Sequence, residues 1–400
     1  MKFSQKIDLR SKYLYLINYS EEVKHTMSLN NLIKGEFNLT DKITYLNHAA
    51  VSPWPTCTSK AITDFAKQNN LYGATYYPEW NKVEQNLRKN LAALINAPSS
   101  DDIALVKNTS EALSMVAYGI DWKPGDNIVI SDQEFPSNRI VWESLADKGV
   151  TLTQVKLKNN PEDTLIAACT TQTRLLAISS TQYSSGINLD LVKLGAACNK
   201  NNILFCVDAI QTIGALQFDV QKIQADFVMA DGHKWMLAPE GLALFYCNEQ
   251  VRSKIKLYEF GWHMTEDMYN FSSKQWKAAD SARRFECGSP NMLGIHGLDA
   301  SVSLLLEIGM DKVESMLLEN TEYLFTLLSK NKNLEIITPQ SSGRYAGIVT
   351  FKHCSKEINE LFDDVWSKKI ICAQRGDGIR YSPHFYTSKD LMKKAVDVLG

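Results

Sequence analysis

The sequence predicts an α/β fold, with a large domain built on a mostly parallel sheet and a smaller α+β domain after it. The middle of the chain alternates short apolar runs, rich in Ile, Val, Leu and Phe, with helical stretches. This alternation is typical of a parallel sheet that helices cover on both faces. The last hundred residues change to a long amphipathic helix followed by short strands and helices. The length of 400 residues also favours two or three domains.

The expected elements follow this order along the chain. Apolar residues recur at helical spacing over residues 59–97, after a weakly patterned start of about 30 residues. Strands are expected at 127–131, 175–179, 203–207, 227–230 and 242–246, with helices at 110–118 and 189–198. The end of the chain predicts a helix over 295–328, strands at 334–337 and 347–352, and helices at 355–368 and 388–399. We expect residues 1–45 to form an extension and part of the small domain, 46–295 the large domain and 296–400 the small domain.

Composition excludes several kinds of partner. The net charge of -2 gives no electrostatic reason to expect nucleic acid or an anionic membrane. No segment resembles a signal peptide or a membrane span, so we expect a cytoplasmic protein. The eight cysteines are scattered without a CxxC pair, which predicts reduced thiols. His353 and Cys354 are neighbours without a second matching pair, so no metal site is expected.

Two predicted strands end in residues with a shared chemical use. One strand ends at Asp208, with Gln211 three residues later, and another runs into Asp231, His233 and Lys234. Strand ends of this kind meet in one crevice of an open α/β sheet. A lysine amine can form a Schiff base with pyridoxal phosphate (PLP), and a carboxylate facing the pyridine nitrogen keeps it protonated. The alternative is a surface lysine and an ordinary strand-end aspartate.

The segments VDAIQTIG (residues 207–214) and GHKWMLAPEG (residues 232–241) resemble the cofactor segment of the class V aminotransferase family of fold type I PLP enzymes. That family includes cysteine desulfurases, kynureninases, isopenicillin-N-epimerase-like proteins and several aminotransferases. Further motifs extend the resemblance from about residue 45 to residue 386. It implies a seven-stranded sheet in the large domain, PLP on Lys234, and Asp208 at the ring nitrogen.

The resemblance also implies roles for other residues. The turn before the helix at 110–118 and the segment around Lys234 would hold the cofactor, and two later loops would complete the site. The implied cofactor-binding residues are Thr109, Ser110, Phe135, Gln182, Gln211, Asp231, His233, Gly288 and Ser289, and the implied substrate-binding residues are Arg380, Asn47 and His48. Phe135 would stack on the ring, and Arg380 would bind the α-carboxylate of an amino acid. Gly288 and Ser289 would reach the partner's phosphate, which implies a homodimer with shared active sites.

The sequence departs from the desulfurase pattern at two places. Desulfurases carry a mobile nucleophilic cysteine well before the carboxylate-binding arginine, whereas only seven residues separate Cys372 from Arg380. They also place a histidine over the ring, where this chain has Phe135, which cannot transfer protons. Lys234 is then the one evident acid–base group, and transamination of an amino acid is the first expectation. A C–S β-lyase or desulfurase-like enzyme, an epimerase, and a non-catalytic binding protein are the alternatives.

Overall fold

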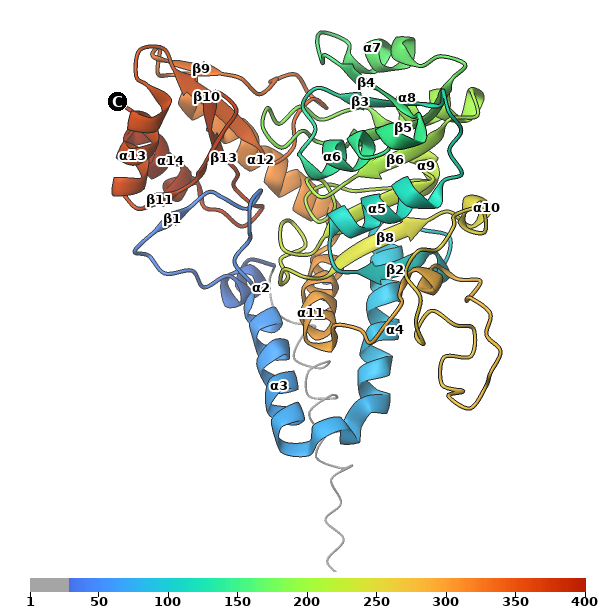
Figure 1. Cartoon of the computed structure of the whole chain (residues 1–400). Helices are drawn as coiled ribbons and strands as arrows, with labels where there is room; N and C mark the ends of the chain where they lie inside the picture. Colours follow the sequence, from blue (N-terminus) through green and yellow to red (C-terminus); the bar gives the residue numbers. More distant parts are fainter. Residues whose placement is uncertain (1–28) are drawn as a thin grey trace, which may run out of the picture.

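The computed structural model describes residues 29–400 and contains a large seven-stranded sheet with two smaller sheets beside it (Figure 1). The part of the expected N-terminal extension before residue 29 lies outside the described residues. The large sheet comprises β2 (Ile103–Val106), β3 (Asn127–Ser131), β4 (Thr151–Val155), β5 (Thr173–Ser179), β6 (Leu204–Asp208), β7 (Phe227–Asp231) and β8 (Ala243–Cys247). Their order is β2-β8-β7-β6-β5-β3-β4, and only β8 runs antiparallel to its neighbours. The predicted mostly parallel α/β fold is therefore confirmed.

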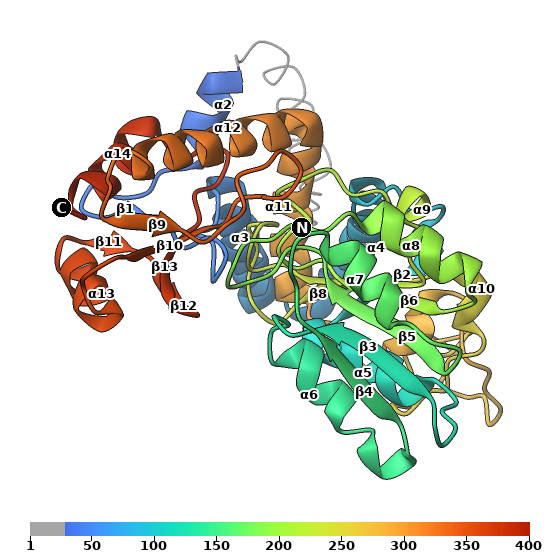
Figure 2. The same cartoon turned by 90° about the horizontal axis from the view of Figure 1, so that it is seen from above.

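Helices cover both faces of this sheet because its strands are buried on both sides. Successive residues of β7 point to opposite faces, so Val228 joins one apolar core and Phe227 and Met229 join the other. Figure 2 shows α5 and α6 on one side of the sheet and α8 and α9 on the other. The helices around the sheet are α3 (Thr56–Tyr72), α4 (Tyr77–Leu94), α5 (Thr109–Gly119), α6 (Ser137–Glu143), α7 (Pro161–Ala168), α8 (Leu191–Lys200), α9 (Val220–Ile223) and α10 (Glu249–Arg252), with short 3₁₀ turns at Gly73–Tyr76, Ser100–Asp102, Ala146–Lys148 and Ala282–Phe285.

The C-terminal part of the chain forms a second, four-stranded antiparallel sheet in the order β12-β13-β10-β9. Its strands are β9 (Leu334–Ile336), β10 (Val349–His353), β12 (Ala373–Arg375) and β13 (Gly378–Tyr381), and α12 (Met310–Leu328), α13 (Ile358–Ser367) and α14 (Lys389–Asp397) lie around it. Near the start of the described chain, α2 (Leu29–Glu36) precedes β1 (Thr44–Tyr45), which pairs with β11 (Ile370–Ile371). The division into domains at residues 46 and 296 stays a prediction.

The single helix expected over residues 295–328 is wrong. The chain forms α11 (Met292–Ile308) and α12, which meet at an angle of 84°. Gly309 separates them with a φ of +91°, a conformation that glycine adopts without steric cost. Within residues 29–400 no single helix is long and apolar enough to cross a bilayer; α11 and α12 reach that length only together, across this bend.

Candidate active site

A cavity of about 430 Å³ opens beyond the carboxyl ends of β6 and β7. Parallel neighbouring strands bring their last residues to the same edge of the sheet, which is where α/β folds bind ligands. The cavity brings together nine of the residues expected from the sequence: Thr109, Ser110, Phe135, Asp208, Gln211, Asp231, His233, Lys234 and Arg380.

Lys234 and Asp208 lie at the centre of this cavity and influence each other's charge. Burial lowers the pKa of the Lys234 amine to about 8, although the Asp208 carboxylate raises it. Burial raises the pKa of Asp208 to about 7, while the backbone N–H of Ile210, 3.1 Å away, and the charge of Lys234 lower it. The Lys234 Nζ atom lies 5.7 Å from the centre of the Phe135 ring. A lysine that loses its proton near neutral pH is suited to form a Schiff base and to transfer protons.

The N-terminus of α5 forms one end of the cavity and has the features of a phosphate site. Asn108 caps the helix, its side chain accepting a hydrogen bond from the N–H of Glu111 at 2.9 Å. Thr109 Oγ1 and His233 Nδ1 are buried and find no hydrogen-bond partner within residues 29–400. Burial lowers the pKa of His233 to about 4, so the ring is neutral at pH 7. Unsatisfied buried donors at a helix N-terminus fit the phosphate of PLP.

Asp231 links this phosphate end to β7. Its Oδ2 atom accepts a hydrogen bond from the N–H of Thr109 at 3.2 Å, and its Oδ1 atom lies 3.9 Å from His233 Nδ1. Burial raises the pKa of Asp231 to about 6. Asp231 therefore fixes the turn of α5 against the lysine-bearing segment, which is a positioning contact.

Arg380 marks the opposite end of the cavity. It lies in β13, its side chain is buried, and Nη1 donates to the carbonyl oxygen of Tyr183 at 2.7 Å. Its Nε and Nη2 atoms have no partner among the described residues. Burial and the charge of Arg375, which also lines the cavity, together lower the pKa of Arg380 to about 9. A buried guanidinium with two free donors suits a carboxylate that binds through both oxygens.

The side-chain amide nitrogens of Gln182 and Gln211 donate hydrogen bonds to other groups of the protein. Gln182 is fully buried outside the cavity lining, and its Nε2 donates to Ser131 and Glu134. Gln211 lines the cavity, yet its Nε2 donates to the Ala49 carbonyl at 3.1 Å and its Oε1 accepts from the Trp235 indole at 2.8 Å. The expected contact of both glutamines with the cofactor stays a prediction.

Asn47 and His48 lie outside the cavity lining. The adjacent residues Ala49, Ala50 and Val51 line it instead. The His48 ring is buried and hydrogen-bonded to the Ser382 carbonyl and to the Tyr386 hydroxyl, each at 2.8 Å. In the structure, His48 therefore supports the substrate side from behind.

Gly288 and Ser289 also lie outside the cavity lining of the single chain. A Cβ added at Gly288 would meet nothing within 4 Å. This open position is compatible with the expected contact to a partner subunit, which stays a prediction.

Sequence reasoning assigned no role to several residues that line the cavity or support it. Tyr183, Arg375 and Ser137 line it. Glu134 is a buried carboxylate that accepts hydrogen bonds from Ser131, Asn138, Ser179 and Gln182. Each of these residues lies close in the sequence to an expected site residue. This proximity is the feature of the sequence that could have indicated them.

Cys372 lies outside the cavity lining, in the apolar core of the smaller sheet. Its side chain is 1% exposed, and burial raises the pKa of the thiol to about 12. A buried, protonated thiol is a poor nucleophile. No other cysteine lines the cavity in the part of the chain that the structure describes.

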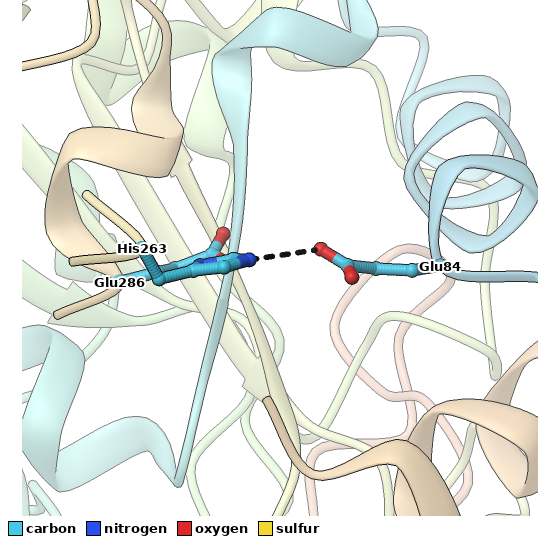
Figure 3. A group of neighbouring side chains, drawn as sticks. All are labelled: Glu84, His263 and Glu286. Atoms are coloured by element: carbon cyan, nitrogen blue, oxygen red, sulfur yellow. Dashed lines mark ion pairs between the residues drawn. The ribbon is translucent and has the colours of Figure 1, made fainter. Parts of the chain in front are cut away.

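A separate group of side chains has the spacing of a metal site. Glu84, His263 and Glu286 bring potential ligand atoms within 4.8 Å of one another (Figure 3). The guanidinium of Arg88 already binds both carboxylates, at 2.5 Å from Glu84 and at 2.5 and 2.7 Å from Glu286. Because this cation already occupies both carboxylates, the group is better explained as a buried ion-pair cluster joining α4 to the loop before α11.

Known proteins share this architecture. The profile of the family described as Aminotransferase class-V matches residues 44–379. A Methanothermobacter thermautotrophicus protein named probable cysteine desulfurase is 30% identical over 83% of each chain. A Bacillus subtilis protein named uncharacterized aminotransferase YcbU is 27% identical over 86% of this chain and 90% of its own. The solved complex of the cystine C–S lyase C-DES with cysteine persulfide has a TM-score of 0.84 at 22% identity, covering 90% of this chain and 97% of the other.

The match to the family profile extends over most of the chain and includes the cavity-lining residues from Ala49 to Arg375, but it ends one residue before Arg380. The fold is the one expected for fold type I, and the unsatisfied donors of Thr109 and His233 lie where a phosphate would be bound. The chain therefore belongs to the class V aminotransferase family of fold type I enzymes, and its cofactor is pyridoxal phosphate.

Proposed function

We propose that this protein is a PLP-dependent C–S β-lyase, which removes a sulfur-containing group from the β-carbon of an amino acid without forming a persulfide on the protein. The observation that carries the proposal is the pairing of Lys234 and Arg380 in a cavity that, within residues 29–400, no cysteine lines. Relatives named cysteine desulfurase and a structural neighbour named cystine C–S lyase support sulfur chemistry. The buried Cys372 disfavours the persulfide version of that chemistry.

Four residues of the cavity have defined tasks in this reaction. Arg380 binds the α-carboxylate and so fixes the α-carbon relative to Lys234. The Lys234 amine, whose pKa is lowered to about 8, removes the α-proton. Bound PLP supplies the electron sink for the resulting carbanion. Asp208 would hold the proton on the ring nitrogen that this role requires, and Phe135 would cover the ring.

Transamination, the first expectation from the sequence, is the second candidate. The relative named uncharacterized aminotransferase favours it, and it uses Lys234 for the same proton removal. The two reactions differ in where the proton is returned and whether a group leaves the β-carbon. Epimerisation stays an alternative expected from the sequence, and it needs a proton donor on each face of the substrate.

Two alanine variants test the roles of the lysine and the cysteine. We expect Lys234→Ala to abolish release of pyruvate from cystine and the visible absorption of the lysine-bound cofactor. Lys222→Ala, at an exposed lysine of α9, is the matched control and should behave as the wild type.

We expect Cys372→Ala to keep the turnover number of the wild type, while the loss of a buried side chain lowers the free energy of unfolding by about 1 kcal/mol. A turnover number that falls by orders of magnitude in a folded Cys372→Ala variant would assign the sulfur-accepting role to this cysteine and refute the proposal. Full activity of Lys234→Ala would refute any PLP chemistry at this site.

A further inference from the structure

We propose that Tyr183 is a catalytic acid of this site, which gives its phenolic proton to the sulfur that leaves the β-carbon. The inference rests on the proposed β-lyase function and deepens it, because it states how the leaving group departs. Alkyl thiolates are poor leaving groups near neutral pH, so a nearby proton donor accelerates their departure.

The cavity contains few candidates for this donor. Lys234 is occupied with the α-proton, and the Phe135 side chain has no proton to give. The hydroxyls of Ser179 and Thr181 already bond to Glu134 and Asn188. His233 lies at the phosphate end with Asp231.

Tyr183 lies at the substrate end of the cavity. Its ring contacts the edge of the Phe135 ring, with the two centres 5.1 Å apart and the planes at 85°. Phe135 in turn lies beside the Lys234 amine, 5.7 Å from its ring centre. Tyr183 therefore lies close to Phe135 and to Arg380, the residue that would bind the substrate carboxylate.

The surroundings of Tyr183 suit proton donation. Its side chain is half-buried, and its hydroxyl has no hydrogen-bond partner among residues 29–400. The backbone carbonyl of Tyr183 holds Arg380 Nη1 at 2.7 Å, which keeps the residue in place. The Arg380 guanidinium also interacts electrostatically with the Tyr183 side chain.

The step balances within the site. The Lys234 amine takes the α-proton, and the electron pair of the Cα–H bond forms the second bond between Cα and Cβ. The Cβ–S bond breaks and its electron pair moves to sulfur, while the O–H bond of Tyr183 breaks and its proton forms the S–H bond of the released thiol. The phenolate beside Arg380 then takes a proton from water. No oxidant or reductant is needed.

The test compares Tyr183→Phe with the wild type on two substrates that differ in the leaving group. S-Methylcysteine releases a thiol that needs a proton, whereas β-chloroalanine releases chloride, which does not. We expect pyruvate release from S-methylcysteine to fall by about 100-fold or more, and release from β-chloroalanine to stay unchanged. The affinity of the apoprotein for PLP, measured by tryptophan fluorescence, should also stay unchanged. Tyr118→Phe, which alters a tyrosine of α5 outside this cavity, is the matched control.

The other outcomes overturn the inference. Equal losses on both substrates, with a raised KM, would make Tyr183 a positioning residue for the substrate. Unchanged rates on both would exclude any role in catalysis. If the wild type released pyruvate from neither substrate, the proposed β-lyase function would fail first, and the role of Tyr183 would fail with it.

Discussion

Asp208 is a carboxylate buried in the core of the site without a basic partner in hydrogen-bond contact in the described chain. Its folded pKa of about 7 lies above the value near 3.9 of an exposed aspartate. The folded apoprotein therefore binds this proton more tightly than the unfolded chain. The resulting stability is fully present below about pH 4 and is lost as the pH rises through about 7.

The variant Asp208→Asn should remove this pH dependence, since an amide keeps the contact to the Ile210 N–H without ionising. We expect the Tm of the apo variant to rise relative to that of the apo wild type as the pH increases from about 4 to about 7, with no further change in the difference above this range. Thermal unfolding of both apoproteins across this range is the measurement. A constant difference in Tm would show that Asp208 stays ionised in the folded apoprotein at all these values.

At the residue scale, the sequence predicted which strand ends carry chemistry but not every direction in which side chains point. Thr181 and Tyr183 line the cavity, whereas Gln182 between them is buried behind it. Neighbouring residues of an extended segment point to opposite sides, so a shift of one residue changes the assignment. The strand ends at Asp208 and Asp231 were predictable because long apolar runs precede them.

At the element scale, the N-terminus of α5 carries the predicted phosphate site. We expect Thr109→Val to weaken PLP binding by about 10-fold to 100-fold, because one hydrogen bond to a charged group contributes about 1.5–3 kcal/mol. Binding of pyridoxal, which lacks the phosphate, should change little. Ser114→Ala, one turn later in α5 at an exposed position, is the control.

Equal weakening of pyridoxal and PLP binding by Thr109→Val would contradict a phosphate contact. Titration of the apoprotein with each compound, followed by tryptophan fluorescence, separates these results.

Among the elements, the central strands were predicted closely and the outer ones were not. β2 has only four residues, and the edge strand β4 has an alternating pattern with exposed positions, so neither stands out as an apolar run. The break between α11 and α12 depends on the backbone at Gly309, and a single glycine inside an amphipathic pattern does not by itself predict a bend.

At the scale of the whole molecule, we propose a homodimer with shared active sites. The loop between α10 and α11 exposes several aromatic side chains to at least half of their area: Tyr258, Phe260, Tyr269, Phe271 and Trp276. Exposed aromatic groups of this size are typical of interaction surfaces. Gly261 in this loop lies directly against the backbone of Cys287, next to Gly288 and Ser289.

A mixing experiment tests whether Ser289 acts across the interface. Lys234→Ala and Ser289→Asp should each be inactive as a pure dimer, because one lacks the base and the other repels the phosphate. Co-expressed chains should recover activity, since a mixed dimer contains one site with an intact Lys234 and an intact Ser289 from its partner. Dimers without recovered activity would place Ser289 in the site of its own chain, and a monomer by sedimentation would exclude sharing.

The most direct test of the proposed function is the product balance of the PLP-loaded wild type with cystine. β-Elimination predicts pyruvate and ammonia in equal amounts, release of the sulfur-containing fragment, and a cofactor spectrum that returns to its starting form. A keto acid that keeps its sulfur, together with accumulation of the amine form of the cofactor, would contradict the proposal and establish transamination. Formation of alanine would instead establish a desulfurase.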